Sequence, residues 1–253
     1  MDAAETIRNA MEVVAQFRND ASSRPVLHRA TVAVKAFQAQ RFAGTYEDLL
    51  SSREYGQATR FFLDDLYSDK DYSLRDAQFA KIAGGLQRLF PKQVVATAVS
   101  LAQLHLLTEE LDRQMANAWM NTETLTDGSD QAERYMACWA AVGREDDRNL
   151  QLGMVVDIGN ELDRLTRVAG LRLMLRMMRG PAMAAGIGSL QAFLESGFDI
   201  FARMSGKGSG AQIFLATIRE RESIWIKHLS GADKLATAVS LRTCLKRAQS
   251  SQQ

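Results

Sequence analysis

The sequence predicts an all-α fold, a multi-helix bundle of roughly eight to ten helices with no sheet. Three observations predict it. Apolar side chains recur about every 3.6 positions along most of the 253 residues, as on the buried face of an amphipathic helix. The chain has only three prolines, and each stands at a predicted helix boundary. No segment shows the apolar–polar alternation, rich in β-branched residues, that is typical of a strand.

The first half of the chain divides into six predicted helices. In the first of them, over 3–18, Ile7, Met11 and Val14 mark one buried face. Pro25 opens the second, because a proline in the first turn removes an N–H that has no partner there. The ranges predicted after the first are 25–41, 45–52, 53–67, 74–89 and 92–120.

The polar stretch 121–130 is the clearest break in the pattern, because it has one glycine and no apolar periodicity. The helices predicted after it span 131–143, 146–178, 182–203, 211–229 and 233–247. Pro181 is expected to end the periodic stretch before it. We therefore predict a single all-α domain over 1–247, with 121–130 as the candidate boundary between two subdomains, and a disordered tail over 248–253.

Composition and charge exclude several classes of protein. There are 31 basic and 30 acidic residues, and a net charge of +1 gives no electrostatic case for binding nucleic acid. No apolar run approaches the ~18 residues of a membrane span, and the N-terminus lacks the pattern of a secretory signal. Cys138 and Cys244 are typical of thiols in a reducing compartment. We expect a cytoplasmic protein.

The first candidate site is acidic. Asp64, Asp65, Asp69 and Asp71 place four carboxylates within eight residues at a predicted helix C-terminus, where the helix dipole disfavours negative charge. Carboxylates are ligands that Mg²⁺ prefers. The segment resembles the aspartate-rich motif of class I isoprenoid synthases, with D-D-x-x-x-D in place of D-D-x-x-D. The resemblance implies a Mg²⁺ site at Asp64, Asp65 and Asp69. The alternative is a solvated helix end.

The second candidate site is basic. Arg172, Arg176 and Arg179 fall within about 60° of one another around a helix axis. Guanidinium groups bind carboxylate or phosphate well, so the stripe is a candidate for binding an anion or an acidic partner, or for holding a diphosphate beside Mg²⁺. The alternative is that these cations only complement the dipole at a helix C-terminus.

Apolar and histidine side chains give two further candidates. The apolar set, which is either an apolar-ligand site or ordinary core, comprises Met174, Met177, Phe193, Phe198 and Phe201.

His105, in the middle of the longest predicted helix, is a candidate haem ligand. The alternative is an intrahelical pair with Glu109, four residues later. No second histidine stands at the spacing of a metal pair.

A wider resemblance covers most of the chain. The segments that carry it are FFLDDLY, RDAQFAKI, LAQLHLLTEELD, GNELDRL, SLQAFLESGFDIF and AQIFLATIRERESI. Together they are similar to a family of all-helical cytoplasmic proteins of proteobacteria with no assigned activity. The resemblance therefore implies a bacterial, cytoplasmic context and no catalytic residue.

The leading functional hypothesis is a non-enzymatic protein that binds a partner or an apolar ligand and acts as a homodimer, because amphipathic and Met-rich helices abound without a coherent catalytic set. Self-association and a small apolar or anionic ligand are the expected interactions. The alternatives are a Mg²⁺-dependent enzyme that processes a diphosphate, and a haem protein that binds iron through His105.

Overall fold

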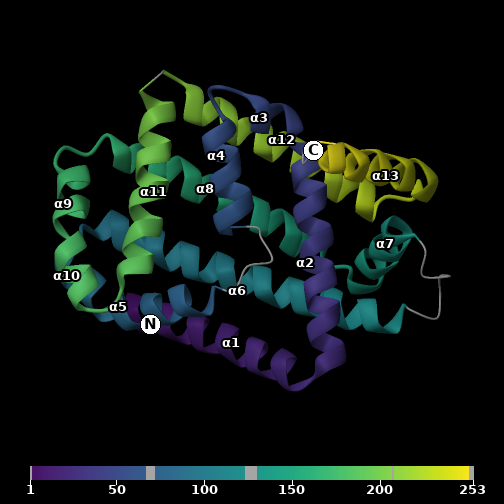
Figure 1. Cartoon of the computed structure of the whole chain (residues 1–253), viewed down its shortest axis with the longest axis horizontal. Coiled ribbons are helices and arrows are strands. Elements are labelled where there is room, and N and C mark those ends of the chain that lie inside the picture. The colour runs from purple at the N-terminus through teal and green to yellow at the C-terminus, as the bar shows by residue number, and fades with distance from the viewer. Residues whose placement is uncertain (1, 67–71, 123–129, 207, 251–253) are drawn as a thin grey trace. The chain divides into compact units, whose positions relative to one another are not determined.

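The computed structural model describes residues 2–66, 72–122, 130–206 and 208–250, without the side chains of 65, 66, 86–89 and 250. Within these ranges the chain forms thirteen α-helices and one π-helical turn, and no strand (Figure 1). The all-α class is confirmed. The expected eight to ten helices is too low, because two predicted helices are divided into shorter ones.

The helices up to residue 121 are α1 (Ala3–Ser23), α2 (Pro25–Thr45), α3 (Glu47–Ser51), α4 (Gly56–Phe61), the π-helical turn η1 (Phe62–Leu66), α5 (Ser73–Leu89) and α6 (Lys92–Asn121). Those that follow are α7 (Gln131–Val142), α8 (Glu145–Thr166), α9 (Leu171–Met177), α10 (Arg179–Ala184), α11 (Gly188–Ser205), α12 (Gly210–Ser230) and α13 (Lys234–Ser250).

The predicted helix 146–178 is interrupted between α8 and α9. Gly170 has a φ of +81°, a left-handed backbone conformation that residues other than glycine rarely adopt. Its apolar neighbours continue the periodic pattern, so the sequence did not reveal the break. Pro181 lies in the first turn of α10 rather than after a helix, whereas Pro25 occupies the first turn of α2 as predicted.

The structure divides into two compact units. Unit 1 comprises Met1–Gln16, Asp71–Leu107 and Gly153–Thr217, and unit 2 comprises Phe17–Lys70, Thr108–Leu152 and Ile218–Gln253. The candidate boundary 121–130 falls inside the second segment of unit 2. The tail predicted over 248–253 begins too early, because α13 continues to Ser250 and Ala248 is buried.

Unit 1 is built on two apolar clusters. In the larger one, Ile7 and Met11 of α1 pack with Phe79 of α5. In the other, Leu175 of α9 packs with Phe198 of α11. The interior of this unit is therefore mainly aliphatic and aromatic.

Unit 2 places aromatic rings and charged groups in its interior. Phe37 of α2 stacks on Tyr135 of α7 with 4.3 Å between ring centroids. Tyr46 and Tyr135 are almost fully buried, and so is Arg41. Among the described residues of the chain, no helix combines the length and the apolar content of a membrane span.

Candidate functional site

A cleft of about 600 Å³ opens in unit 2 where the end of α2 meets α3, α12 and α13. This volume is typical of pockets that hold small molecules. The residues that line the cleft are Gly44, Thr45, Glu47, Asp48, Arg221, Trp225, Val239, Ser240, Thr243, Cys244 and Arg247.

One wall of the cleft depends on a close approach of two helices. A Cβ at Gly44 of α2 would lie 1.9 Å from the carbonyl oxygen of Cys244 in α13, so any side chain here would force the two backbones apart. Glycine is therefore required where α2 and α13 cross, and this contact fixes the position of Cys244.

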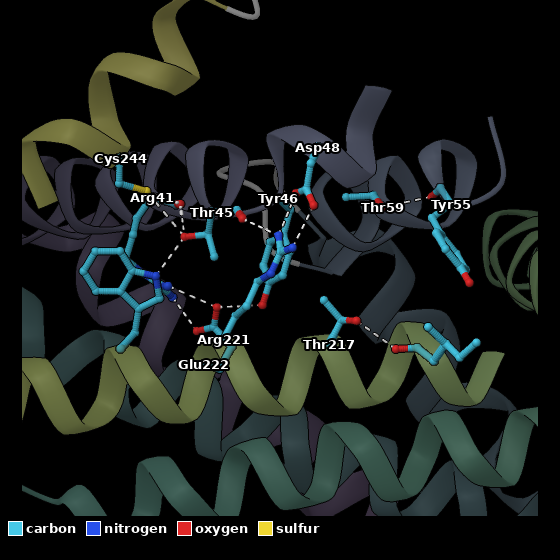
Figure 2. A network of polar contacts seen from close by, with 12 residues as sticks. Arg41, Thr45, Tyr46, Asp48, Tyr55, Thr59, Thr217, Arg221, Glu222 and Cys244 are labelled. Atoms are coloured by element: carbon cyan, nitrogen blue, oxygen red, sulfur yellow. Dashed lines mark hydrogen bonds and ion pairs between the residues drawn. The ribbon is translucent and has the colours of Figure 1, made fainter. Parts of the chain in front are cut away.

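A buried ion pair lies behind the cleft. Arg41 of α2 donates to both carboxylate oxygens of Glu222 in α12, at 3.1 and 2.7 Å, and the Tyr46 hydroxyl donates to the same carboxylate at 2.8 Å (Figure 2). Burial alone would lower the pKa of Arg41, but the Glu222 carboxylate outweighs it and the net pKa is raised. Arg41 therefore stays charged, and both of its terminal nitrogens donate to the Glu222 carboxylate.

The indole and the thiol of the cleft are fixed by the same stretch of α2. Trp225 Nε1 donates to Thr45 Oγ1 at 2.9 Å, and Cys244 Sγ donates to the Arg41 carbonyl at 3.1 Å. The Arg41 guanidinium lies 5.6 Å from the Trp225 ring centroid, a cation–π contact. Burial raises the pKa of Cys244, so its sulfur is a neutral thiol near pH 7.

A second arginine closes the rim. Arg221 of α12 binds both carboxylate oxygens of Asp48 in α3, at 2.6 and 2.7 Å, and also donates to the Thr45 carbonyl at 2.8 Å (Figure 2). Hydrogen bonding to Arg221 lowers the pKa of Asp48. Because this pair is partly exposed to water, a ligand can compete for either partner.

The lining is chemically mixed. The lining includes two guanidinium groups, two carboxylates and three hydroxyls, and an indole and a valine supply apolar surface. Such a surface can bind a molecule with groups of both charges and an apolar body.

The predicted basic stripe lies in unit 1, where carboxylates of α11 partly neutralise it. Arg172 binds Asp199 at 2.9 Å, and Arg179 binds Glu195. Arg176 makes no ion pair within the described residues, although its charge helps to lower the pKa of Glu195. The counter-charges thus come mainly from the neighbouring helix.

The predicted apolar set is divided between buried, half-buried and exposed positions. Phe198 and Phe201 are buried, whereas Met174 and Phe193 are half-buried against the clusters of unit 1. Met177 alone is exposed, with 69% of its surface accessible. Four of the five residues therefore contribute to core packing.

The predicted metal ligands are only partly described. Asp64 lies exposed in η1, while the side chain of Asp65 and the whole of Asp69 lie outside the described residues. Among the residues that are described, no three His, Cys, Asp or Glu side chains form a group that could hold a metal ion. Magnesium binding by the aspartate-rich segment stays a prediction.

The candidate haem ligand already has a carboxylate partner. His105 Nε2 lies 2.9 Å from Asp76 Oδ2 of α5, within unit 1. Glu109, its predicted partner, forms an ion pair with Lys35 at 2.7 Å in unit 2. Iron at Nε2 would have to displace Asp76, and haem binding stays a prediction.

The sequence predicted none of the cleft as a binding site. One signal was present: Val34, Phe37 and Arg41 continue a single helical stripe, and a charged residue in line with buried apolar ones indicates a buried ion pair.

Comparison with known proteins gives the family but no activity. Neither the curated proteins nor the solved structures yielded a match to the chain. The model of a family described as a domain of unknown function (DUF8198) matches residues 16–235, which cover most of the chain. This range includes Arg41, Arg221 and Trp225. The chain therefore belongs to the DUF8198 family.

Proposed function

We propose that this protein is a non-enzymatic binding protein whose unit 2 holds a small amphipathic molecule bearing both an acidic and a basic group. The observation that carries the proposal is the composition of the cleft. Arg221 and Arg247 offer positive charge, Glu47 and Asp48 offer negative charge, and the indole of Trp225 offers a flat apolar surface. A ligand that bears both charges can take the place of each partner of the Arg221–Asp48 pair, whereas a ligand with a single charge can replace only one of them.

The rigidity of the walls supports a binding role. Because Arg41 and Tyr46 are buried and both bind Glu222, α2 and α12 are held together before a ligand arrives. Preorganised walls reduce the entropy that is lost on binding. The cleft therefore needs little rearrangement to accept a molecule of suitable size.

The polar groups of the cleft favour holding a ligand over transforming it. The Cys244 thiol is neutral and donates to a backbone carbonyl, and Glu222 is shared by Arg41 and Tyr46. A nucleophile needs a lowered pKa or an adjacent base. These groups are committed to structure, which supports binding without chemistry.

The dipeptide Phe-Phe is a suitable probe, since it carries an ammonium group, a carboxylate and two rings. With about 23 non-hydrogen atoms and about 0.3 kcal/mol per atom, we expect a Kd of about 10 µM by titration calorimetry. The N-acetylated peptide and the peptide amide lack one charge each. Both should bind at least about tenfold more weakly, because each can replace only one partner of the Arg221–Asp48 pair.

Two variants of α13 test whether the dipeptide binds in the cleft. Thr243→Trp fills the cleft and should abolish binding, whereas Leu235→Trp, two turns away and outside the lining, should leave the Kd unchanged. If the zwitterion binds no better than its singly charged forms, or if both variants bind alike, the proposed ligand class or the proposed site is wrong.

A further inference from the structure

The α9–α10 surface of unit 1 exposes large apolar side chains. Leu173, Met177 and Met183 are 63%, 69% and 71% exposed. Leu173 and Met177 lie one turn apart on α9, and their neighbours Arg172 and Arg176 form a parallel exposed line. We call the set Arg172, Leu173, Arg176, Met177, Arg179 and Met183 the basic–apolar face.

This face carries a surplus of positive charge. Its three guanidinium groups are set against two carboxylates of α11, and Arg176 is the member that makes no ion pair within the described residues. Exposed methionines adapt readily to a partner surface, because their side chains are flexible and polarisable. An occupant should therefore combine apolar side chains with negative charge.

The same chain offers a surface of that chemistry in unit 2. Glu145 and Asp146 in the first turn of α8 are exposed and make no ion pair in the described part of the chain, and Leu150, one turn after Asp146, is 55% exposed. Acidic residues here also complement the dipole at the N-terminus of α8. We call these three residues the acidic–apolar face.

We propose that the basic–apolar face of one molecule binds the acidic–apolar face of a second copy of this chain. Arg176 then lies against Asp146 or Glu145 of the partner, and Leu150 of the partner packs on Met177. The contact is small, so the association is weak, in the micromolar range, and weakens with added salt. The proposal is independent of the cleft.

Sedimentation velocity over a concentration series tests the pairing by exchanging charges. Arg176→Glu and Asp146→Lys should each raise the dissociation constant at least about tenfold, because each brings like charges together. The double variant, which restores opposite charges, should return to within about threefold of the wild type. Thermal unfolding of each variant verifies that it is folded.

The controls concern the apolar half of the contact. Met177→Ser should weaken association, whereas Leu74→Ser, in unit 1 and 63% exposed like Leu173, should not. The proposal is overturned if the wild type stays monomeric throughout, if the double variant does not recover, or if Leu74→Ser weakens association as much as Met177→Ser.

Discussion

One arginine–carboxylate pair of unit 2 is much more buried than a comparable pair of unit 1. In unit 2 the Arg41 and Glu222 side chains are 7% and 12% exposed, and the Tyr46 hydroxyl donates to the same Glu222 carboxylate. In unit 1 Arg172 and Asp199 are 52% and 31% exposed. Removing one partner of a buried pair greatly lowers the free energy of unfolding, because the other charge stays buried without compensation. Exposed pairs exchange with water and contribute little to stability. The buried pair joins α2 and α12 behind the cleft, and the exposed pair lies on a surface that other molecules can reach.

The largest expected effect follows from breaking the buried pair. Glu222→Gln leaves the Arg41 charge uncompensated in the interior, and we expect a loss of about 3–5 kcal/mol in the free energy of unfolding. Asp199→Asn, the matched change in the exposed pair, should cost less than about 1 kcal/mol. Denaturant titration measures both. Equal losses would remove the distinction between the buried and the exposed pair.

The next effect concerns the crossing of α2 and α13. Gly44→Ala places a methyl group against the Cys244 backbone and should cost about 1–3 kcal/mol or more. Gly153→Ala in α8 meets nothing within 4 Å and should stabilise the protein by about 0.5–1 kcal/mol. The two changes are chemically identical, so opposite signs in denaturant titration test the close approach directly. A neutral Gly44→Ala would contradict it.

A smaller expected effect concerns two carboxyl groups whose pKa values are shifted in opposite directions, so that they contribute to stability with opposite signs. Burial raises the pKa of Asp112 in unit 2, although Lys35 opposes the shift. In unit 1, hydrogen bonding to Arg179 lowers the pKa of Glu195. An ionised Asp112 therefore costs stability at neutral pH, and an ionised Glu195 contributes it.

Replacing each of these carboxyl groups by an amide should therefore change the melting temperature in opposite directions. Asp112→Asn should raise the melting temperature at neutral pH, and the gain should shrink as the pH falls through the raised pKa towards the unfolded value of about 3.9. Glu195→Gln should lower it, and the loss should shrink as the pH falls through the lowered pKa of Glu195. Thermal unfolding at several pH values measures both. Changes of the same sign would refute the assigned shifts.

The fold class and most helix ranges could be predicted, because the apolar period of 3.6 depends only on local sequence. The break before α9 could not, since it depends on the left-handed conformation of Gly170. The arginine stripe was visible in the sequence, but its partners Glu195 and Asp199 lie on another helix and only packing reveals them.

The cleft was the hardest feature to predict. Thr45, Arg221 and Cys244 come from three helices and have no motif in common. Their meeting depends on the crossing at Gly44, which is a tertiary contact. Sequence patterns report which face of a helix is buried, and they do not report which helix covers it.

The three indole N–H signals in a ¹H–¹⁵N spectrum test the central claim most directly. Trp225 lines the cleft and is half-buried, whereas Trp119 and Trp139 are 6% and 7% exposed and do not line it. On titration with the Phe-Phe dipeptide, the Trp225 signal should move and saturate while the other two stay in place. If the Trp225 signal does not respond, or if all three move together, the cleft is not the binding site that we propose.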